Sequence, residues 1–442
     1  MKSLSRVTIA GALALLLVAA TSAQAPQTNA PVSAAERGLA DYIDAHNGDG
    51  LALLERVVNI NSGTENLGGV RAVGDIFKSD FEALGFTTRW VDGAGWQRAG
   101  HLIADHPAAG PRLLLIGHLD TVFAPSSPFQ KLEHLDAKTA RGPGVIDMKG
   151  GDVIILQALK ALNASGLLKT TNVVVVMTGD EEEPGRPLAR ARAALVEAAK
   201  GAQVAIGFED GDGDPAHAIV ARRGTISWQL TVTGTPAHSS QIFSEPVGDG
   251  AIFEASRILN AFRERMSAEP HLTFNPGMIL GGTTADLDAA QSKGTAFGKT
   301  NVVAEHAVVT GDLRALTMAQ FAKAEQTMKD IVAKPLARTS ATLVFDEGYP
   351  PLAPAPGNER LLGLYARASL DLGLGPVTAV SPDKAGAADV SFVAGEVPMI
   401  IDAVGLKGHD DHTPGETADL STLPIQTKRA AVLLARLARG ER

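Results

Sequence analysis

The stretch LLLIGHLD, residues 113–120, sets the pattern for the chain, because an apolar run leads directly into a histidine and a carboxylate. Three further short apolar runs lead in the same way into acidic or histidine-containing segments. They are Val173–Met177, Val204–Phe208 and Met399–Val404. Runs of this length that are rich in Val, Ile and Leu are typical of strands buried in a parallel sheet.

Helical patterns lie between these predicted strands, as in Val153–Leu162 and Leu188–Ala199. The alternation of strands and helices predicts an α/β domain, with a mostly parallel sheet and helices on both faces. We expect this α/β domain to be formed by residues 35–221 and 350–442.

Residues 222–349 show a different pattern, which predicts a smaller α+β domain inserted into the first. We expect an antiparallel sheet with two amphipathic helices that cover one of its faces. The predicted strands are Ile226–Thr233, one within Val302–Leu313, and Ala341–Phe345, and the predicted helices are Ala251–Met266 and Met318–Val332. This order predicts a ferredoxin-like domain.

The composition limits the classes of function. The chain has 442 residues, with 40 Lys and Arg against 49 Asp and Glu, and a formal net charge of −9 at pH 7. This acidic balance argues against nucleic acid or an anionic membrane as partner, since both need a basic surface. The sequence has no cysteine, which excludes disulfides, thiolate nucleophiles and cysteine-ligated zinc. Any metal site must therefore use His, Asp and Glu.

The first 25 residues are typical of a secretory signal peptide. Lys2 and Arg6 form a basic start, Val7–Ala20 is largely apolar, and Ala23-Gln24-Ala25 fits a small-x-small cleavage site. A membrane anchor is the alternative, but an apolar run of about 14 residues is shorter than the roughly 20 that span a bilayer. We expect export, cleavage after Ala25, and a mature protein that is periplasmic if the source is Gram-negative and has no membrane attachment.

Acidic and histidine residues gather where the predicted strands end. In chain order these groups are His118 and Asp120, Asp180–Glu183, Glu209 and Asp210, and then His409 and His412. In open parallel sheets, ligands bind outside the carboxyl ends of the strands, so we expect these groups to face one crevice. A solvated acidic loop would explain any one of these segments alone, but four such segments together indicate a site.

Without cysteine, histidines and carboxylates describe a site for divalent metals such as zinc, manganese or cobalt, and the histidines favour zinc. More ligands are available than one tetrahedral ion needs. Two ions about 3.5–4 Å apart, sharing a bridging carboxylate and a water, would use them all. A neighbouring glutamate that binds no metal would then accept the proton of the water, whose hydroxide attacks the substrate.

Seven motifs in order resemble those of a known family. They are GHLD (117–120), GPGVIDMKGG (142–151), TGDEEE (178–183), FED (208–210), TGTPAHSS (233–240), Asn301 with Asp312-Leu313-Arg314, and HTPGE (412–416). Together they resemble the zinc-dependent glutamate carboxypeptidase and acetylornithine deacetylase family of metallopeptidases, which comprises exopeptidases and amidohydrolases. The likeness runs from about Ala35 to the C-terminus.

The resemblance implies a role for each matching residue. His118 and Glu209 would bind one ion, Glu182 and His412 the other, Asp147 both, while Asp120 would orient His118 and Glu181 would be the general base. It also implies a cis peptide bond between Asp147 and Met148. The implied activity is hydrolysis of amide bonds in dipeptides or short peptides that bear a free carboxylate.

The resemblance assigns the inserted domain the roles of lid and dimer surface. His238 resembles a residue that reaches into the active site of the partner in a homodimer and stabilises the oxyanion. Asn301 and Arg314 resemble lid residues that bind the backbone and the carboxylate of the substrate. Arginine suits that task because its planar fork pairs with a carboxylate through two hydrogen bonds.

Two assignments have a competitor next to them in the sequence. The pair Glu182 and Glu183 is the alternative to Glu181 and Glu182, because three glutamates are consecutive. His409 competes with His412, although the spacing of HTPGE matches the family better with His412. Asp389, in the segment GAAD, resembles a position near the substrate pocket, and its role is left open.

Alternative functions use the same residues. Glutamate-releasing members carry a further arginine near the end of the lid, where this chain reads Glu347-Gly348-Tyr349-Pro350-Pro351, so the sequence does not predict specificity for glutamate. An N-acyl amino acid deacylase of the same family would share the metal site and differ in the pocket. A catalytically silent binding or dimerisation protein is the alternative from another class.

Overall fold

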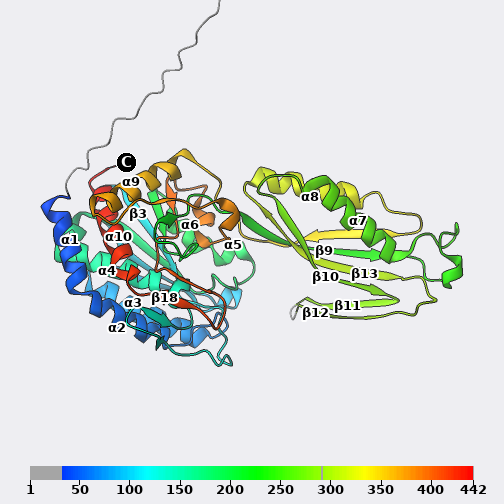
Figure 1. Ribbon diagram of the computed structural model, residues 1–442, viewed down its shortest axis with the longest axis horizontal. Helices are drawn as coiled ribbons and strands as arrows, with labels where there is room; N and C mark the ends of the chain where they lie inside the picture. The colour runs from blue at the N-terminus through cyan, green and yellow to red at the C-terminus, as the bar shows by residue number, and fades with distance from the viewer. Residues whose placement is uncertain (1–31, 290–291, 442) are drawn as a thin grey trace, which may run out of the picture. The chain divides into compact units, whose positions relative to one another are not determined.

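The structure is a computed structural model that describes residues 32–289 and 292–441 (Figure 1). The predicted signal peptide, residues 1–25, lies outside the described residues. Within them, none of the helices combines the length and the apolar character needed to cross a bilayer.

A six-stranded sheet forms the centre of the catalytic domain, with the strand order β1-β2-β6-β3-β7-β16. The strands are β1 (Thr87–Asp92), β2 (Gly100–His106), β3 (Arg112–His118), β6 (Asn172–Thr178), β7 (Ala202–Gly207) and β16 (Ile400–Ile401). The pairs from β6 to β16 are parallel, whereas β1 and β2 add an antiparallel edge that the apolar runs did not predict. The predicted mostly parallel sheet is confirmed.

Alternate residues of each inner strand face different helix layers, as the predicted α/β class requires. In β3, Leu113 and Leu115 pack into one hydrophobic cluster, whereas Leu114 and Ile116 pack into another. The first cluster is built with α1 (Ala34–Ala45), α2 (Asn47–Val58), α3 (Leu67–Ala83), α4 (Gly150–Ala164), α9 (Pro356–Asp371) and α10 (Thr422–Ala438). The second contains α6 (Ala193–Ala199) and the turn Asp389–Val393. The sheet is therefore buried on both faces, with helices in both layers (Figure 1).

Two predicted elements are shorter than expected, and in both a buried charge lies at the break. The helix expected over 188–199 is divided into α5 (Leu188–Ala191) and α6 at Arg192, whose side chain is buried among carboxylates. The last strand is reduced to Ile400–Ile401, because Asp402 turns its carboxylate to Arg222 at 2.8 Å and Ala403 takes a positive φ of 63°.

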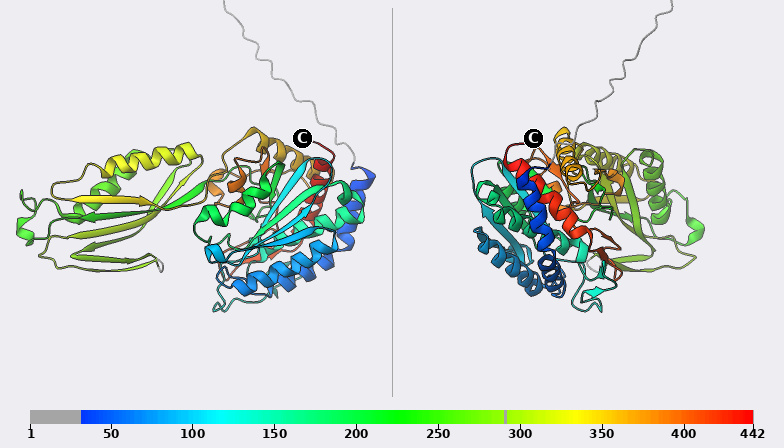
Figure 2. Two further views of the ribbon diagram at one scale, coloured as in Figure 1. Left: turned by 180° about the vertical axis from the view of Figure 1, so that it is seen from behind. Right: turned by 60° about the vertical axis from the view of Figure 1, so that its left-hand side comes forward.

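The inserted domain contains a four-stranded antiparallel sheet in the order β10-β13-β9-β14. Its elements are β9 (Gly224–Thr233), α7 (Gly250–Met266), β10 (Thr273–Gly282), β13 (His306–Ala315), α8 (Met318–Val332) and β14 (Ser340–Phe345). This βαββαβ order matches the predicted ferredoxin-like arrangement, with both helices on one face of the sheet (Figure 2), although β10 was not among the predicted strands. A hairpin of β11 (Thr284–Asp288) and β12 (Lys293–Phe297) was not predicted.

The connections into and out of the inserted domain run beside each other. Arg222 pairs with Leu352, and Thr225 pairs with Tyr349, both as antiparallel bridges. The segment that returns from the inserted domain is therefore held against the segment that enters it.

Small sheets position the loops above the central sheet. One has the order β17-β18-β5-β4 and contains β17 (Gly408–His409), β18 (Thr417–Asp419), β5 (Thr139–Arg141) and β4 (Glu133–His134). Another pairs β15 (Thr378–Ala379) with β8 (His217–Ala218). The first sheet holds the loop 410–416 beside the loop 142–149, although more than 250 residues separate them in the sequence.

The first described helix is fastened to the last one by Glu36. Its Oε1 lies 2.8 Å from Arg436 Nε and 3.0 Å from Arg439 Nη2, and its Oε2 accepts a hydrogen bond from the Ser33 N–H. Burial by itself raises the pKa of Glu36, but the bonds from Arg436 and Ser33 lower it to about 2 from 4.5. Because the folded pKa is depressed, this contribution to stability is present above about pH 4.5 and is lost as the pH falls towards 2.

We therefore predict that Glu36→Gln lowers the free energy of unfolding by about 2 kcal/mol at pH 7 and by much less at pH 3. Urea unfolding of both proteins at the two pH values measures this difference. Glu197→Gln, which removes an exposed ion pair with Lys200, is the matched control and should leave the unfolding midpoint unchanged. An equal loss for Glu36→Gln at both pH values would contradict the assignment.

Candidate metal centre

The carboxyl ends of three neighbouring parallel strands supply the core of the site. His118 is the last residue of β3, Glu181 and Glu182 follow the end of β6, and Glu209 follows the end of β7. Since β3 lies between β6 and β7, these side chains converge at one edge of the sheet. The expected convergence is therefore found for His118, Glu182, Glu209 and His412, whereas Glu183 pairs with Arg98 and His409 lies in β17.

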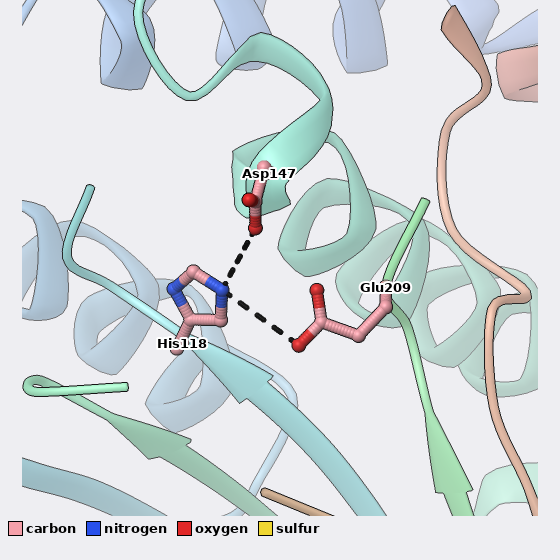
Figure 3. A group of neighbouring side chains, drawn as sticks. All are labelled: His118, Asp147 and Glu209. Carbon is pink, nitrogen blue, oxygen red and sulfur yellow. Dashed lines mark hydrogen bonds and ion pairs between the residues drawn. The ribbon is translucent and has the colours of Figure 1, made fainter. Parts of the chain in front are cut away.

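His118 faces two carboxylates with one ring nitrogen. Its Nε2 lies 3.1 Å from Asp147 Oδ1 and 3.7 Å from Glu209 Oε1 (Figure 3). Its Nδ1 lies 3.1 Å from the carbonyl oxygen of Asp120 and 3.6 Å from its carboxylate. The imidazole is thus oriented from one side by Asp120 and presents Nε2 to the other two residues.

Asp147 stands between two histidines. Its Oδ1 faces His118, and its Oδ2 lies 2.9 Å from Nε2 of His412, which is also 3.1 Å from Glu182 Oε2. Each oxygen of one carboxylate therefore faces a different imidazole, as a carboxylate that bridges two cations must.

The loop that carries Asp147 is held by Glu416. The Glu416 carboxylate accepts backbone hydrogen bonds from Gly144 at 2.8 Å, Ile146 at 2.9 Å and Asp147 at 3.2 Å. The peptide bond between Asp147 and Met148 is cis, as the resemblance implied. Glu416 was not among the predicted site residues, although it is the last residue of the HTPGE motif.

The carboxylate of Asp120 holds the loop that carries the glutamates. It accepts hydrogen bonds from the backbone N–H groups of Glu181 at 3.0 Å and Glu182 at 3.2 Å, and from the Thr64 hydroxyl at 2.6 Å. Asp120 therefore connects His118 to the glutamate loop as well as orienting the imidazole.

The sequence left Glu183 and His409 open as alternative site residues, and the contacts of both argue against them. Glu183 is exposed and pairs with Arg98 at 3.1 Å, so it points away from the donors. His409 lies in β17 and belongs to neither of the donor groups found in the described part of the chain. This geometry supports Glu181 with Glu182, and His412.

Among the residues that the structure describes, two groups of donor atoms are compact enough to hold an ion. His118, Asp147 and Glu209 form one group, and Asp147, Asp411 and His412 form the other, with the atoms of each group within 4.8 Å of one another. Asp411 was not predicted, although it directly precedes His412. The second position therefore has Asp411 as well as Glu182 beside His412.

The electrostatics of the donors fit a cation. Burial raises the pKa of Glu182 to about 8, and hydrogen bonds to Asp147 and Glu182 raise the pKa of His412 to about 11. The Oε1 atom of Glu182 is buried and has no hydrogen-bond partner among the described residues. A buried carboxylate oxygen without a hydrogen-bond partner is costly. Together with the neighbouring histidines and carboxylates, it forms a set of ligands that suits a divalent ion.

The inserted domain contains three predicted site residues, and two of them are neighbours. His238 and Asn301 are neighbours, since Ser239 N–H donates to the Asn301 carbonyl oxygen and His238 bridges to Val302. Arg314 lies in β13, with Nε 2.8 Å from Asp312 Oδ2. In the ranges that the structure describes, no hydrogen bond or ion pair joins any of these three residues to the metal donors.

The chain is similar to known peptidases. The family described as peptidase family M20/M25/M40 matches residues 114–436. Carboxypeptidase G2 from Pseudomonas sp. (strain RS-16) is 25% identical over 446 residues, which covers 99% of each chain. A probable succinyl-diaminopimelate desuccinylase from Staphylococcus aureus (strain MRSA252) is 29% identical, over 38% of this chain and 40% of that protein.

Solved structures share the fold. An aminopeptidase PepT from Bacillus cereus ATCC 10987 superposes with a TM-score of 0.70 at 19% identity, covering 89% of this chain and 99% of that one. An M20 family metallo-carboxypeptidase from Sulfolobus solfataricus gives a TM-score of 0.65 at 15% identity, covering 88% and 99%. Since the family match spans most of the chain, the protein belongs to peptidase family M20/M25/M40 and is a metallopeptidase, a hydrolase of peptide bonds.

Proposed function

We propose that this protein is a carboxypeptidase-like enzyme that uses two divalent ions, most simply zinc, to hydrolyse dipeptides or short peptides with a free carboxylate. The observation that carries the proposal is the Asp147 carboxylate, whose two oxygens face His118 and His412. Glu209 would complete the first position, and Glu182 the second, with Asp411 as an additional donor. Ions at these positions supply Lewis acidity, which polarises a carbonyl group and lowers the pKa of water.

Glu181 is proposed as the general base. Burial holds the pKa of its carboxyl group well above the usual range, and catalytic acids and bases are often shifted in this way by their surroundings. Glu181 accepts a proton from the attacking water at its carboxylate and donates it to the leaving nitrogen, so the peptide bond breaks with a neutral amine as the product.

The inserted domain is proposed to bind the substrate and a second copy of the chain. Arg314 and Asn301 would take the carboxylate and backbone of the substrate, and His238 of a homodimer partner would stabilise the developing oxyanion. Arg314 uses Nε for Asp312, and within the described residues the ends of its guanidinium are left for a carboxylate. Export to the periplasm is also proposed, from the basic, apolar and small-x-small pattern of residues 1–25.

An N-acyl amino acid deacylase is the second candidate. It is favoured by the partial similarity to a probable succinyl-diaminopimelate desuccinylase, an enzyme named for the removal of a succinyl group. The two candidates share the metal centre and differ in what they accept on the amino side of the scissile bond.

We predict that the zinc-loaded mature protein releases the C-terminal amino acid from dipeptides faster than it releases amino acids from their N-acetyl forms. Mass spectrometry of a panel of both substrate classes measures the two rates. The C-terminal amide of each cleaved dipeptide is the matched control, and it should react at least about tenfold more slowly because it lacks the charge that Arg314 would bind. Faster hydrolysis of the N-acetyl series would favour the deacylase, and no hydrolysis of either class would favour a binding protein.

Glu181→Gln should lower kcat by about 10³-fold, because a glutamine cannot accept the proton of the water. Metal analysis should find the same zinc content as in the wild type. Glu183→Gln is the control, since the exposed Glu183 pairs with Arg98, and it should retain full activity. Full activity of Glu181→Gln, with loss of activity in Glu183→Gln, would move the base to another residue.

His412→Ala should remove about one equivalent of zinc, because His412 is the only imidazole proposed for the second position. His409→Ala changes a histidine three residues away in β17 and should keep the wild-type zinc content. Atomic absorption after dialysis against a weak chelator gives both stoichiometries. Unchanged zinc in His412→Ala would remove this residue from the ligand set.

A further inference from the structure

A buried arginine lies close to the proposed base and takes no part in the metal centre. Arg192, at the break between α5 and α6, is only 1% exposed in its side chain. Its Nη1 lies 2.6 Å from Asp180 Oδ1, its Nε lies 2.7 Å from Asp389 Oδ1, and its Nη2 donates to the Tyr349 hydroxyl at 2.7 Å. The guanidinium thus uses all three of its nitrogens inside the protein.

The partners of Arg192 are themselves held in place. The second oxygen of Asp180 accepts a hydrogen bond from the Gly185 N–H at 2.9 Å, and the second oxygen of Asp389 accepts one from the Thr178 hydroxyl at 2.7 Å. A network in which each buried charge is paired and hydrogen-bonded is rigid, because breaking any one bond leaves a buried charge uncompensated.

The network reaches the proposed base through Tyr349. The Tyr349 hydroxyl accepts the hydrogen bond from Arg192 and donates its own proton to the backbone carbonyl oxygen of Glu181 at 2.7 Å. On the other side of the same residue, the Glu181 N–H donates to Asp120 Oδ1 at 3.0 Å. Both backbone polar groups of Glu181 are therefore fixed by buried side chains.

We propose that Arg192 and Tyr349 are positioning residues, which hold the backbone of Glu181 so that its carboxylate meets the attacking water in a reactive geometry. The inference rests on the proposed role of Glu181 as the base. A small displacement of a catalytic group lowers the rate strongly, so a rigid network behind Glu181 would preserve its activity.

The position of Tyr349 in the chain adds a second consequence. Tyr349 lies on the segment that returns from the inserted domain, and its carbonyl oxygen accepts a hydrogen bond from the Thr225 N–H at 3.0 Å. The residue that holds the base is thus part of the connection to the proposed lid. Asp389, whose role the sequence left open, acts in this network by fixing Arg192.

Tyr349→Phe tests the inference, since it removes one hydroxyl and keeps the ring that packs against Phe392. We expect kcat on the best dipeptide to fall about tenfold, with KM within about twofold and zinc content unchanged. Tyr365→Phe is the matched control, because Tyr365 is also buried and donates to Gln426 at 3.2 Å in the helix layer, and its kcat should equal that of the wild type. Arg192→Lys keeps the positive charge but loses the planar guanidinium, which bonds several partners at once. This variant should also lower kcat about tenfold.

A double variant separates positioning from a merely structural role. In the Glu181→Gln background, Tyr349→Phe should cause no further loss of the residual rate, because the group that it positions is already gone. A normal kcat for folded, zinc-containing Tyr349→Phe would overturn the inference, as would a change confined to KM or a further tenfold loss in the double variant. The wild-type assay comes first, so an inactive wild type counts against the proposed function, whereas an active wild type with an equally active Tyr349→Phe counts against this inference alone.

Discussion

The Asp147 carboxylate, held between two imidazoles, is the constraint around which the rest of the site is arranged. One oxygen faces His118, which comes from the central sheet, and the other faces His412, which comes from a loop near the C-terminal end of the chain. The carboxylate has to be held accurately to serve both, and Glu416 fixes its loop by accepting hydrogen bonds from three N–H groups. Asp120 holds the glutamate loop in the same way, so two of the donor segments are each fixed by a buried carboxylate.

Gathering so many carboxylates away from water is costly, and the protein compensates with buried cations. Arg192 pairs with Asp180 and Asp389, and Arg222 pairs with Asp402 at 2.8 Å, just beneath the donor loops. Burial lowers the pKa of Lys149 to about 7, although nearby carboxylates raise it. The acidic net charge of the chain therefore says little about the local field, which is set by these pairs and by the ions proposed at the centre.

The sequence predicted what depends on local pattern. Apolar runs located β3, β6 and β7, and the residues that follow each run are the ones that converge, because parallel strands end at one edge of a sheet. It did not predict the hairpin of β11 and β12, the break at Arg192, or the parts played by Glu416 and Tyr349, since each depends on contacts between distant segments. The roles proposed for His238, Asn301 and Arg314 involve a substrate and a second chain, so neither local pattern nor contacts within one chain decide them.

The central claim is that one carboxylate serves two ions. Anomalous diffraction at the zinc edge, from crystals of the zinc-loaded protein, tests this claim most directly. The account predicts two peaks about 3.5–4 Å apart, one beside each oxygen of Asp147, with His118 at one peak and His412 at the other. A single peak that excludes His412, or two peaks that do not share Asp147, would contradict it.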